Sequence, residues 1–353
     1  MSQSTIASKL QFWSYRLSTI CKSFKTLYSL PQEKIDAFLN SYNIYDHDWV
    51  NEEQLIEKMG AGYYKEIQKK LVDYYSVLNH LCAIGHVEKM YIPPAIDLSK
   101  SIIANQILFE EKMSRDLGVG KGSKVLDIGC GRGRVANHVA SFTGAHVIGI
   151  NIDAGQLEAA RQFAAGKGMT EQCQFKFGDL NDIPLPFADN SLDAVYQIQV
   201  FSLSKNLEKL FKDLYRILKP GAKLACLDWV RLSKYDGNNP EHVSLMKRIK
   251  PLIGAIGTPS VEEYVGLLRN VGFEVAISEN ASVGGFQAPL IENADRFFTR
   301  VNRAIQFLVR WKILPGHFKA LFDRLTKDGE AFIEADRKGL VTTSYYIVAQ
   351  KKA

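Results

Sequence analysis

Short apolar runs alternate with amphipathic helical patterns along the chain from residue 123 onward. Runs rich in Val, Ile and Leu predict strands, and the stretches between them place apolar residues three and four apart, as a helix does. This alternation indicates βαβ units, so we expect an α/β fold on a mostly parallel seven-stranded sheet with helices on both faces. The predicted strands lie within residues 125–128, 146–150, 175–177, 194–198, 223–227, 272–275 and 345–349, with helices within 134–142, 156–165 and 205–218.

The chain before residue 120 shows helical patterns, and its first 32 residues are also basic. A basic amphipathic helix with a Trp is typical of segments that lie at a bilayer interface. The same pattern fits a helix that docks on the main domain, or a mitochondrial transit peptide, and periodicity does not decide among the three. The segment has four cations and no acid, and its apolar residues at helical spacing are Leu10, Trp13, Leu17, Ile20, Phe24 and Leu27.

A second basic and aromatic segment precedes the last predicted strand. Phe286–Leu325 has seven Lys or Arg residues against three Asp or Glu, with aromatic residues interleaved. It is predicted to form a helical lid over a binding cavity or a surface that touches lipid, with core packing as the alternative. The patterns together predict four segments: a helical extension over 1–62, substrate-region helices over 63–120, a central α/β domain over 121–280 and a C-terminal segment over 281–353.

Composition narrows the class of protein. The 353 residues are 46% hydrophobic, which is enough to bury a core, and the net charge of +6 is below that of most dedicated nucleic-acid binders. The five cysteines are scattered without CxxC spacing, so we expect a reducing compartment and no metal site. No apolar run is long enough to span a bilayer. The expected location is cytoplasmic, with peripheral attachment at the endoplasmic reticulum membrane as an open alternative.

A glycine-rich loop follows the first predicted strand and opens a helix. It is Asp127–Gly133, with the sequence DIGCGRG. Glycines at alternate positions let the backbone approach a ligand closely, because no β-carbons intervene. The acid before the glycines suits a ligand with a cationic amine, whereas dinucleotide enzymes hold a pyrophosphate at a GxGxxG loop. Arg132 and Arg134 keep a phosphate ligand open at this point.

Polar residues at the ends of the following strands decide between these ligands. Asn151 ends the second predicted strand, Gly178–Leu180 ends the third, and Asp189–Tyr196 leads into the fourth. This ordered set resembles the class I S-adenosylmethionine-dependent methyltransferases, which implies a Rossmann-like fold and S-adenosylmethionine as cofactor. The resemblance places Asp127 at the methionine amine, Asn151 at the ribose and Asp179 at the adenine. The other cofactor-binding residues it implies are Gly129, Gly131, Gly133, Gln156, Leu180 and Gln197.

Further segments resemble the sterol methyltransferases. Asn151–Gln156 is similar to their ribose segment, the stretch from Asp228 to residue 242 follows the fifth strand as theirs does, and residues 331–349 resemble their C-terminal domain. The resemblance begins near residue 63 and runs to the end of the chain. It implies a sterol or related lipid as substrate, bound in part by Tyr74, Tyr75, Gln199 and Trp229.

The chain departs from the side-chain (C-24) enzymes where the acceptor would bind. Those enzymes have a segment of the type Tyr-Glu-Trp-Gly-Trp-Gly, whose aromatic rings can stabilise a sterol cation, and this chain has Cys82–Val87 there, with only Gly85 in common. They also carry a Glu and a His after the fourth strand, where this chain has Gln199 and Leu203. Retained cofactor residues with altered acceptor residues predict methylation at another carbon.

Carbon 4 of a 3-oxo sterol is the candidate, because its enolate is already nucleophilic and needs a base and an oxyanion donor. The chain also resembles the nematode-type sterol 4-methyltransferases in this respect. The residues predicted to act in catalysis are His86 and His80 as base and Tyr196 as donor, and the alternative reaction is C-24 side-chain methylation.

Other classes of protein were weighed against this one. A nucleic-acid methyltransferase is not favoured, because Gln197-Ile-Gln-Val follows the fourth strand in place of an Asn/Asp-Pro-Pro-Tyr motif. A methyltransferase of another lipid, such as a quinone, and a non-catalytic sterol-binding protein remain alternatives. The expected partners are a lipid substrate and, at the periphery, a membrane, with no nucleic acid; a homo-oligomer is left open.

Overall fold

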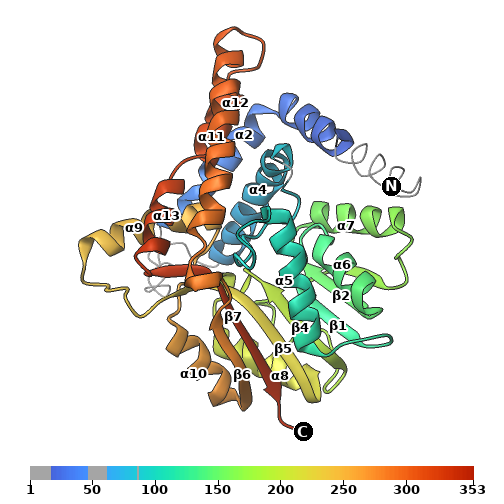
Figure 1. The fold of residues 1–353 in the computed structure, drawn as a ribbon. Helices are drawn as coiled ribbons and strands as arrows, with labels where there is room; N and C mark the ends of the chain where they lie inside the picture. The colour runs from blue at the N-terminus through green and yellow to red at the C-terminus, as the bar shows by residue number, and fades with distance from the viewer. Residues whose placement is uncertain (1–16, 47–61, 86) are drawn as a thin grey trace. The chain divides into compact units, whose positions relative to one another are not determined.

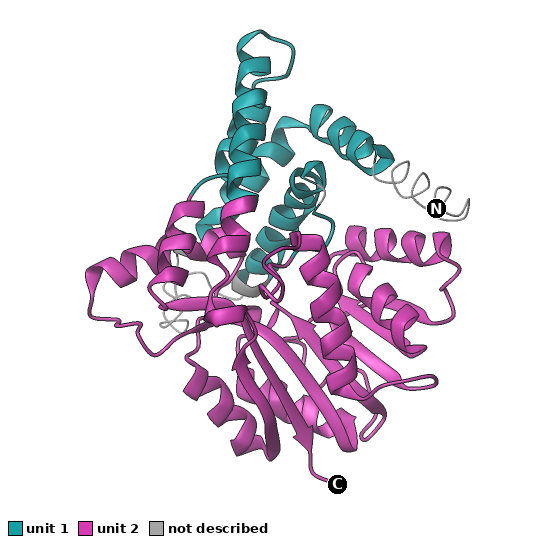
Figure 2. Cartoon of the chain, in the orientation of Figure 1, with its two compact units in different colours: residues 1–47, 52–90, 294–327 teal, residues 48–51, 91–293, 328–353 magenta. Residues whose placement is uncertain are grey.

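The computed structural model describes residues 17–46, 62–85 and 87–353 (Figure 1). The chain divides into two compact units, teal and magenta in Figure 2. Unit 1 comprises residues 1–47, 52–90 and 294–327, and unit 2 comprises residues 48–51, 91–293 and 328–353. Unit 2 contains the whole central α/β domain predicted over 121–280, and the fourfold division of the chain stays a prediction.

Unit 2 is built on a seven-stranded sheet of order β3-β2-β1-β4-β5-β7-β6. The pairs from β3 to β5 are parallel, and β7 runs antiparallel to both β5 and β6. The predicted mostly parallel seven-stranded sheet is therefore confirmed. Its strands are β1 (Lys124–Ile128), β2 (His146–Asn151), β3 (Cys173–Phe177), β4 (Leu192–Ile198), β5 (Leu218–Arg231), β6 (Phe273–Asn280) and β7 (Val341–Lys351).

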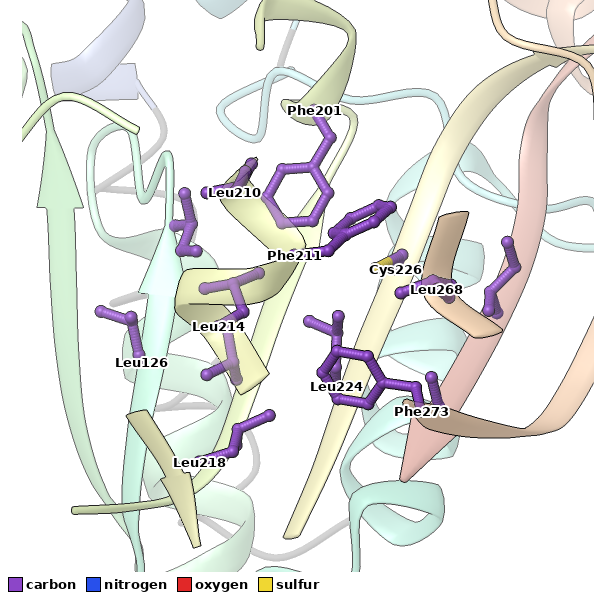
Figure 3. Close-up of a cluster of buried hydrophobic side chains, with 14 of the residues drawn as sticks. Leu126, Phe201, Leu210, Phe211, Leu214, Leu218, Leu224, Cys226, Leu268 and Phe273 are labelled. Atoms are coloured by element: carbon purple, nitrogen blue, oxygen red, sulfur yellow. The ribbon is translucent and has the colours of Figure 1, made fainter. Parts of the chain in front are cut away.

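Helices cover both faces of this sheet because side chains alternate along each strand. Leu126 belongs to the cluster under α8 and α10, shown in Figure 3, whereas its neighbour Val125 packs with α5, α6 and α7 on the other face. The helices of unit 2 are α5 (Ile102–Leu117), α6 (Arg134–Thr143), α7 (Ala154–Gly166), α8 (Leu207–Ile217), α9 (Pro240–Ile253), α10 (Val261–Val271), the first residues of α11 (Ala288–Arg310) and α13 (Gly329–Arg337), with short 3₁₀ turns η4 (Phe201–Leu203) and η5 (Val283–Gly285).

The fifth strand begins earlier than predicted. The sequence predicts a helix within 205–218 and a strand within 223–227, but α8 already ends at Ile217 and β5 starts at Leu218. Leu218 pairs with Leu192 of β4, and Gly221 takes a φ of +77°. Pro-Gly therefore forms a turn inside β5, which pairs with β4 both before this turn, at Leu218, and after it, at Lys223. Glycine is suited to this position because it adopts a positive φ readily.

Unit 1 is helical and has its own core. Phe38 and Tyr74 pack there with Phe318 and Phe322, all almost fully buried. Its elements are α2 (Gln32–Ser41), η1 (Tyr42–Asp46), α4 (Tyr63–Ile84), the part of α11 from residue 294 and α12 (His317–Leu325).

The helical residues 17–28 pack against α12 within unit 1. The rings of Phe24 and Phe318 are 5.3 Å apart, and the His317 Nε2 lies 2.8 Å from the carbonyl oxygen of Leu27. These contacts lie within unit 1 and not with the central α/β domain, so the three alternatives for this segment stay predictions, and Leu10 and Trp13 lie outside the described residues. Within the described part of the chain, no helix is long and apolar enough to cross a membrane.

Candidate active site

Asp127 lies at the carboxyl end of β1, in register with Tyr196 on β4. The two strands are parallel, so both side chains point to the same face of the sheet. The Asp127 Oδ2 and the Tyr196 hydroxyl are buried, and neither has a well-aligned hydrogen bond to any described residue. Burial raises the pKa of Asp127 to about 7, against the lowering effect of the nearby Tyr196 hydroxyl. A buried acceptor without a partner is costly unless a ligand supplies a donor.

Glu110 is a second buried carboxylate near this position, and it was not predicted from the sequence. It is fully buried on α5 and accepts hydrogen bonds from the Tyr91 hydroxyl (2.6 Å) and from His138 Nδ1 on α6 (2.5 Å). Its charge acts with burial to raise the pKa of Asp127. A signal was present, because Glu110 occupies a position in the apolar stripe of α5 where a charged residue is unusual.

The loop after β1 is a cradle that only glycine forms without strain. Gly129, Gly131 and Gly133 have φ values of +73°, +52° and +70°. A β-carbon at Gly129 would lie 2.5 Å from Val200, and one at Gly133 would lie 2.6 Å from Phe175. The loop is held by the amides of Gly129 and its successor, which both donate to the carbonyl oxygen of residue 150. Glycine is therefore needed for this loop to pack against Val200 and Phe175.

Asn151 and Gln156 meet at the end of β2. The Asn151 Nδ2 donates to Gln156 Oε1 (3.2 Å), and a β-carbon on Gly131 would lie 3.2 Å from that same oxygen. The structure thus brings three of the predicted cofactor residues together. Asp179 follows β3 and accepts from the backbone amide of residue 181 (2.8 Å), whereas Leu180 packs in the core cluster of Figure 3.

These features fit S-adenosylmethionine. The carboxylate oxygen of Asp127 that lacks a well-aligned hydrogen bond suits a cationic amine, and the positive φ angles of the glycines let the loop turn tightly beside it. Asn151 and Asp179, at the ends of the next two strands, are polar groups of the kind that hold a ribose and an adenine amino group. Asp127, the glycine loop, Asn151 and Asp179 are the residues that would hold the cofactor.

Cofactor affinity should depend on pH through Asp127. Its pKa of about 7 in the ligand-free protein means that the carboxyl must lose a proton before it can pair with the cationic amine. Below pH 7 we expect the dissociation constant of S-adenosylmethionine to rise about tenfold for each pH unit, with a plateau above. Titration calorimetry across this range measures the effect, and in the Asp127→Asn variant this dependence should be absent.

A buried polar cluster supports the ends of β4 and β5. The Asp228 carboxylate accepts from Gln197 Nε2 (2.9 Å), from the Tyr264 hydroxyl (3.2 Å) and from the amide of Trp229 (2.9 Å). Gln197 also accepts from the amide of Val200 (2.8 Å), so both ends of its side chain are engaged within the protein. This environment favours a positioning role for Gln197, and its predicted contact with the cofactor stays a prediction.

Trp229 is buried among apolar side chains of α9 and α13, which favours packing over its predicted role in binding substrate. Tyr196 lies beside Asp127, which favours orientation of that carboxylate over its predicted role as catalytic donor. Both predicted roles therefore stay predictions, and the local contacts give each side chain a structural function.

The segment from Tyr91 to Ala95 is held in place within unit 2 by polar side chains that are distant in the sequence, a feature not predicted from the sequence. Gln199 exchanges two hydrogen bonds with the backbone of Ile92 (3.1 and 2.7 Å) and donates a third to the carbonyl oxygen of Thr343 (2.8 Å). The fully buried Gln287 donates to the carbonyl oxygen of residue 93, and the hydroxyl of residue 282 accepts from the amide of residue 95. The predicted substrate residue Gln199 is thus a structural clamp.

Replacing Gln199 by Glu should destabilise the protein. Its Nε2 donates to two carbonyl oxygens, and a carboxylate would instead face both of them. We expect a loss of about 2–3 kcal/mol in the free energy of unfolding, measured by urea denaturation. Gln350→Glu is the matched control, because Gln350 donates only one such bond, to Gly221, and it should lose about 1 kcal/mol. Equal losses of stability in the two variants would contradict the role of Gln199 as a clamp.

The remaining predicted residues lie in unit 1. Tyr74 is buried in its core with its ring 4.9 Å from that of Tyr75, and burial raises the pKa of Tyr75 to about 12. His80 Nδ1 lies 3.2 Å from the hydroxyl of Ser23. His86 lies outside the described residues. The catalytic roles of both histidines stay predictions. Among the described side chains, no cluster of His, Cys, Asp or Glu is suited to a metal ion.

Comparison with known proteins agrees with this site. A family profile described as "Methyltransferase domain" matches residues 126–226. Two solved structures share the fold: the [4+2]-cyclase SpnF, with a TM-score of 0.63 at 19% identity over 80% of this chain and 96% of that one, and geranyl diphosphate C-methyltransferase from Streptomyces coelicolor A3(2), with a TM-score of 0.60 at 16% identity over 81% and 98%. At these identities they show the fold alone.

The fold and the site define a class I S-adenosylmethionine-dependent methyltransferase, which confirms the predicted enzyme class and cofactor. The chain is 30% identical to a sterol 24-C-methyltransferase of Pneumocystis carinii, over 69% of each chain. It is 29% identical to another from Gibberella zeae, over 78% of this chain and 74% of that one. The chain belongs to the sterol methyltransferase family, as the sequence motifs predicted.

Proposed function

We propose that this sterol methyltransferase adds its methyl group at carbon 24 of the sterol side chain. The observation that carries the proposal is the identity of about 30% to proteins named sterol 24-C-methyltransferases, over more than two thirds of the chain. This reverses the order of preference from the sequence, in which carbon 4 came first and carbon 24 was the alternative. S-adenosylmethionine, when bound, supplies a methyl group on a cationic sulfur, which an electron-rich carbon can attack.

The residues of this chain hold and orient the reactants. The Asp127 carboxylate would be the counter-ion for the cofactor amine, and the glycine loop, with its positive φ angles, would line the cofactor beside it. The clamped segment around Ile92 gives unit 2 a fixed surface beyond the ends of β4 and β7. Exclusion of water from such a site protects a reactive sterol carbon from side reactions.

Carbon 4 of a 3-oxo sterol is the second candidate, on two specific observations. The segment from Cys82 to Gly85 has no carboxylate. The Cys82 thiol is half-buried, and loss of solvent raises its pKa to about 12. A β-carbon on Gly85 would lie 2.3 Å from the Phe298 ring. Gln199 has its amide fully occupied and cannot serve as a base. Both features suit an acceptor that is already an enolate, since no alkene-derived cation then needs stabilising.

Two matched substrates separate the candidates. One has a Δ24 side chain and a 3-hydroxyl, and the other has a saturated side chain and a 3-oxo group. Each is incubated with the protein and methyl-labelled S-adenosylmethionine, and mass spectrometry of the product locates the label. Label in the side-chain fragment of the first substrate supports carbon 24. Label confined to the ring fragment of the second would overturn it in favour of carbon 4, and label only in an added quinone would overturn both.

A further inference from the structure

The outer face of α11 carries a row of arginines with exposed rings beside it. Arg296, Arg300, Arg303 and Arg310 are separated by three, four or seven residues, which places them on one side of the helix. All four side chains are exposed. Like charges three residues apart, as at Arg300 and Arg303, repel one another and destabilise a helix.

The opposite side of α11 explains why this face points outward. Val301, Ile305 and Leu308 pack in the core of unit 1, and two amides of α11 are anchored to α12. Asn302 Nδ2 (3.1 Å) and Gln306 Nε2 (2.6 Å) both donate to the Asp323 carboxylate. The two helices therefore form a hairpin, visible side by side in Figure 1, with the arginine row on its outside.

Six cations of this hairpin fall into two groups. Lys319 pairs with Asp323 (2.5 Å), and the guanidinium of Arg324 lies 3.7 Å from the centre of the Tyr42 ring. By contrast, Arg300, Arg303, Arg310 and Lys312 form no ion pair with any residue that the structure describes. The second group lies along α11 and in the turn that follows it, so the unneutralised charge is concentrated on one surface.

Large apolar side chains are exposed at the same place. Phe307, Trp311 and Ile313 have exposed fractions of 59%, 66% and 60%, and the rings of Phe307 and Trp311 are 6.1 Å apart. Exposure of two neighbouring rings, with a third large apolar side chain two residues further along the chain, is unfavourable in water and marks an interaction surface. Trp at a polar–apolar boundary with Arg around it is the composition of segments that lie at a bilayer interface.

We infer that the α11–α12 hairpin docks on an anionic membrane surface through Arg300, Arg303, Phe307, Arg310, Trp311 and Ile313. The arginines match anionic phospholipid headgroups in charge, and the three apolar side chains match the region beneath them. A nucleic acid fits less well, because Ile313 has no ring on which a base can stack. This inference goes beyond the proposed function and does not depend on which carbon is methylated.

Vesicle binding of the full chain tests the inference. Wild-type protein should bind vesicles of phosphatidylcholine and phosphatidylserine in equal parts, and hardly bind phosphatidylcholine alone. The triple variant Arg300→Glu, Arg303→Glu, Arg310→Glu should bind the anionic vesicles about a hundredfold more weakly, since each cation contributes roughly fivefold. Equal binding of the variant, or tighter binding of the wild type to RNA than to vesicles, would overturn the inference.

A control variant separates local docking from net charge. Lys209→Glu, Lys247→Glu, Arg269→Glu changes the charge by the same amount at exposed positions of α8, α9 and α10. This control variant should bind anionic vesicles nearly as tightly as the wild type. If it loses as much affinity as the α11 variant, net charge explains the binding and the docking surface does not. Brominated lipids should quench the emission of the wild type more than that of Trp311→Phe, and equal quenching would contradict insertion of this ring.

Enzyme assays keep this test independent of the proposed function. The α11 triple variant should methylate sterol delivered by cyclodextrin at the wild-type rate and vesicle-embedded sterol more slowly. If the wild type methylates no sterol at all, the proposed function is wrong. The vesicle-binding experiment still shows in that case whether the hairpin docks on a membrane. Equal rates of wild type and variant on vesicle-embedded sterol would count against docking as the route to substrate.

Discussion

The Asp127→Asn variant should lose its affinity for S-adenosylmethionine and keep its fold. Loss of a charge-assisted contact to the cofactor amine removes roughly 3 kcal/mol, so the dissociation constant should rise about a hundredfold. The amide matches the carboxylate in shape, and it carries no charge that must be buried. Because burial raises the pKa of Asp127 to about 7, the ionised form is destabilised in the folded state at higher pH. At pH 8 the ligand-free variant should therefore be at least as stable as the wild type.

Asp228→Asn is the matched control, and it should lose stability while it keeps its affinity for S-adenosylmethionine. Burial also raises the pKa of Asp228 to about 7, but both of its oxygens accept hydrogen bonds from within the protein. The new amide nitrogen would face the donor of Gln197 or of the Trp229 backbone, at a cost of about 1–3 kcal/mol in stability. Calorimetry measures the dissociation constant of the cofactor for each variant, and urea denaturation measures the free energy of unfolding of each. Loss of stability without loss of affinity in Asp127→Asn would contradict its assignment to the cofactor.

Gly133→Ala should strongly destabilise the protein. The residue has a φ of +70°, and a β-carbon would lie 2.6 Å from Phe175 and 2.8 Å from the β-carbon of Ala160. The Ala160 atom is fixed to a helix backbone and cannot rotate away. Strain at this φ and overpacking together should cost about 3 kcal/mol in the free energy of unfolding. The shift of α6 that relieves the clash should also weaken cofactor binding, because the loop moves with it.

Gly168→Ala is the control that measures the cost of the left-handed backbone without any steric contact. Gly168 has a φ of +68°, almost the same as Gly133, but nothing lies within 4 Å of a β-carbon there. This variant should lose only about 1 kcal/mol and bind the cofactor normally. Chemical denaturation and calorimetry measure both quantities. Equal losses at the two positions would mean that the left-handed backbone, and not the contact with Phe175 and Ala160, explains the glycine.

The sheet and the cofactor loop were predictable because their signals are local. The seven apolar runs marked the strands, and the DIGCGRG loop marked the switch from β1 to α6 within seven residues. The position of β7 between β5 and β6 was not predictable in the same way, since strand order depends on pairing between residues far apart in the chain.

The polar interior of unit 2 was predicted least well. Gln199, Gln287 and Ser282 converge on the segment from Tyr91 to Ala95, across sequence separations of more than a hundred residues. An isolated Gln or Ser has no periodicity that marks it as buried, so the sequence suggested a substrate contact for Gln199 and nothing for the others. Membrane contact, cytoplasmic location and a homo-oligomer likewise stay predictions.

Transfer of labelled methyl groups from S-adenosylmethionine to a sterol tests the central claim most directly. The protein is incubated with the cofactor carrying a deuterated methyl group and with a mixture of Δ24 and 3-oxo sterols, and the lipid extract is read by mass spectrometry. We predict a sterol product heavier by one deuterated methyl group with the wild type and none with Asp127→Asn. Unmodified sterols in the presence of a cofactor-binding, folded protein would contradict the assignment as a sterol methyltransferase.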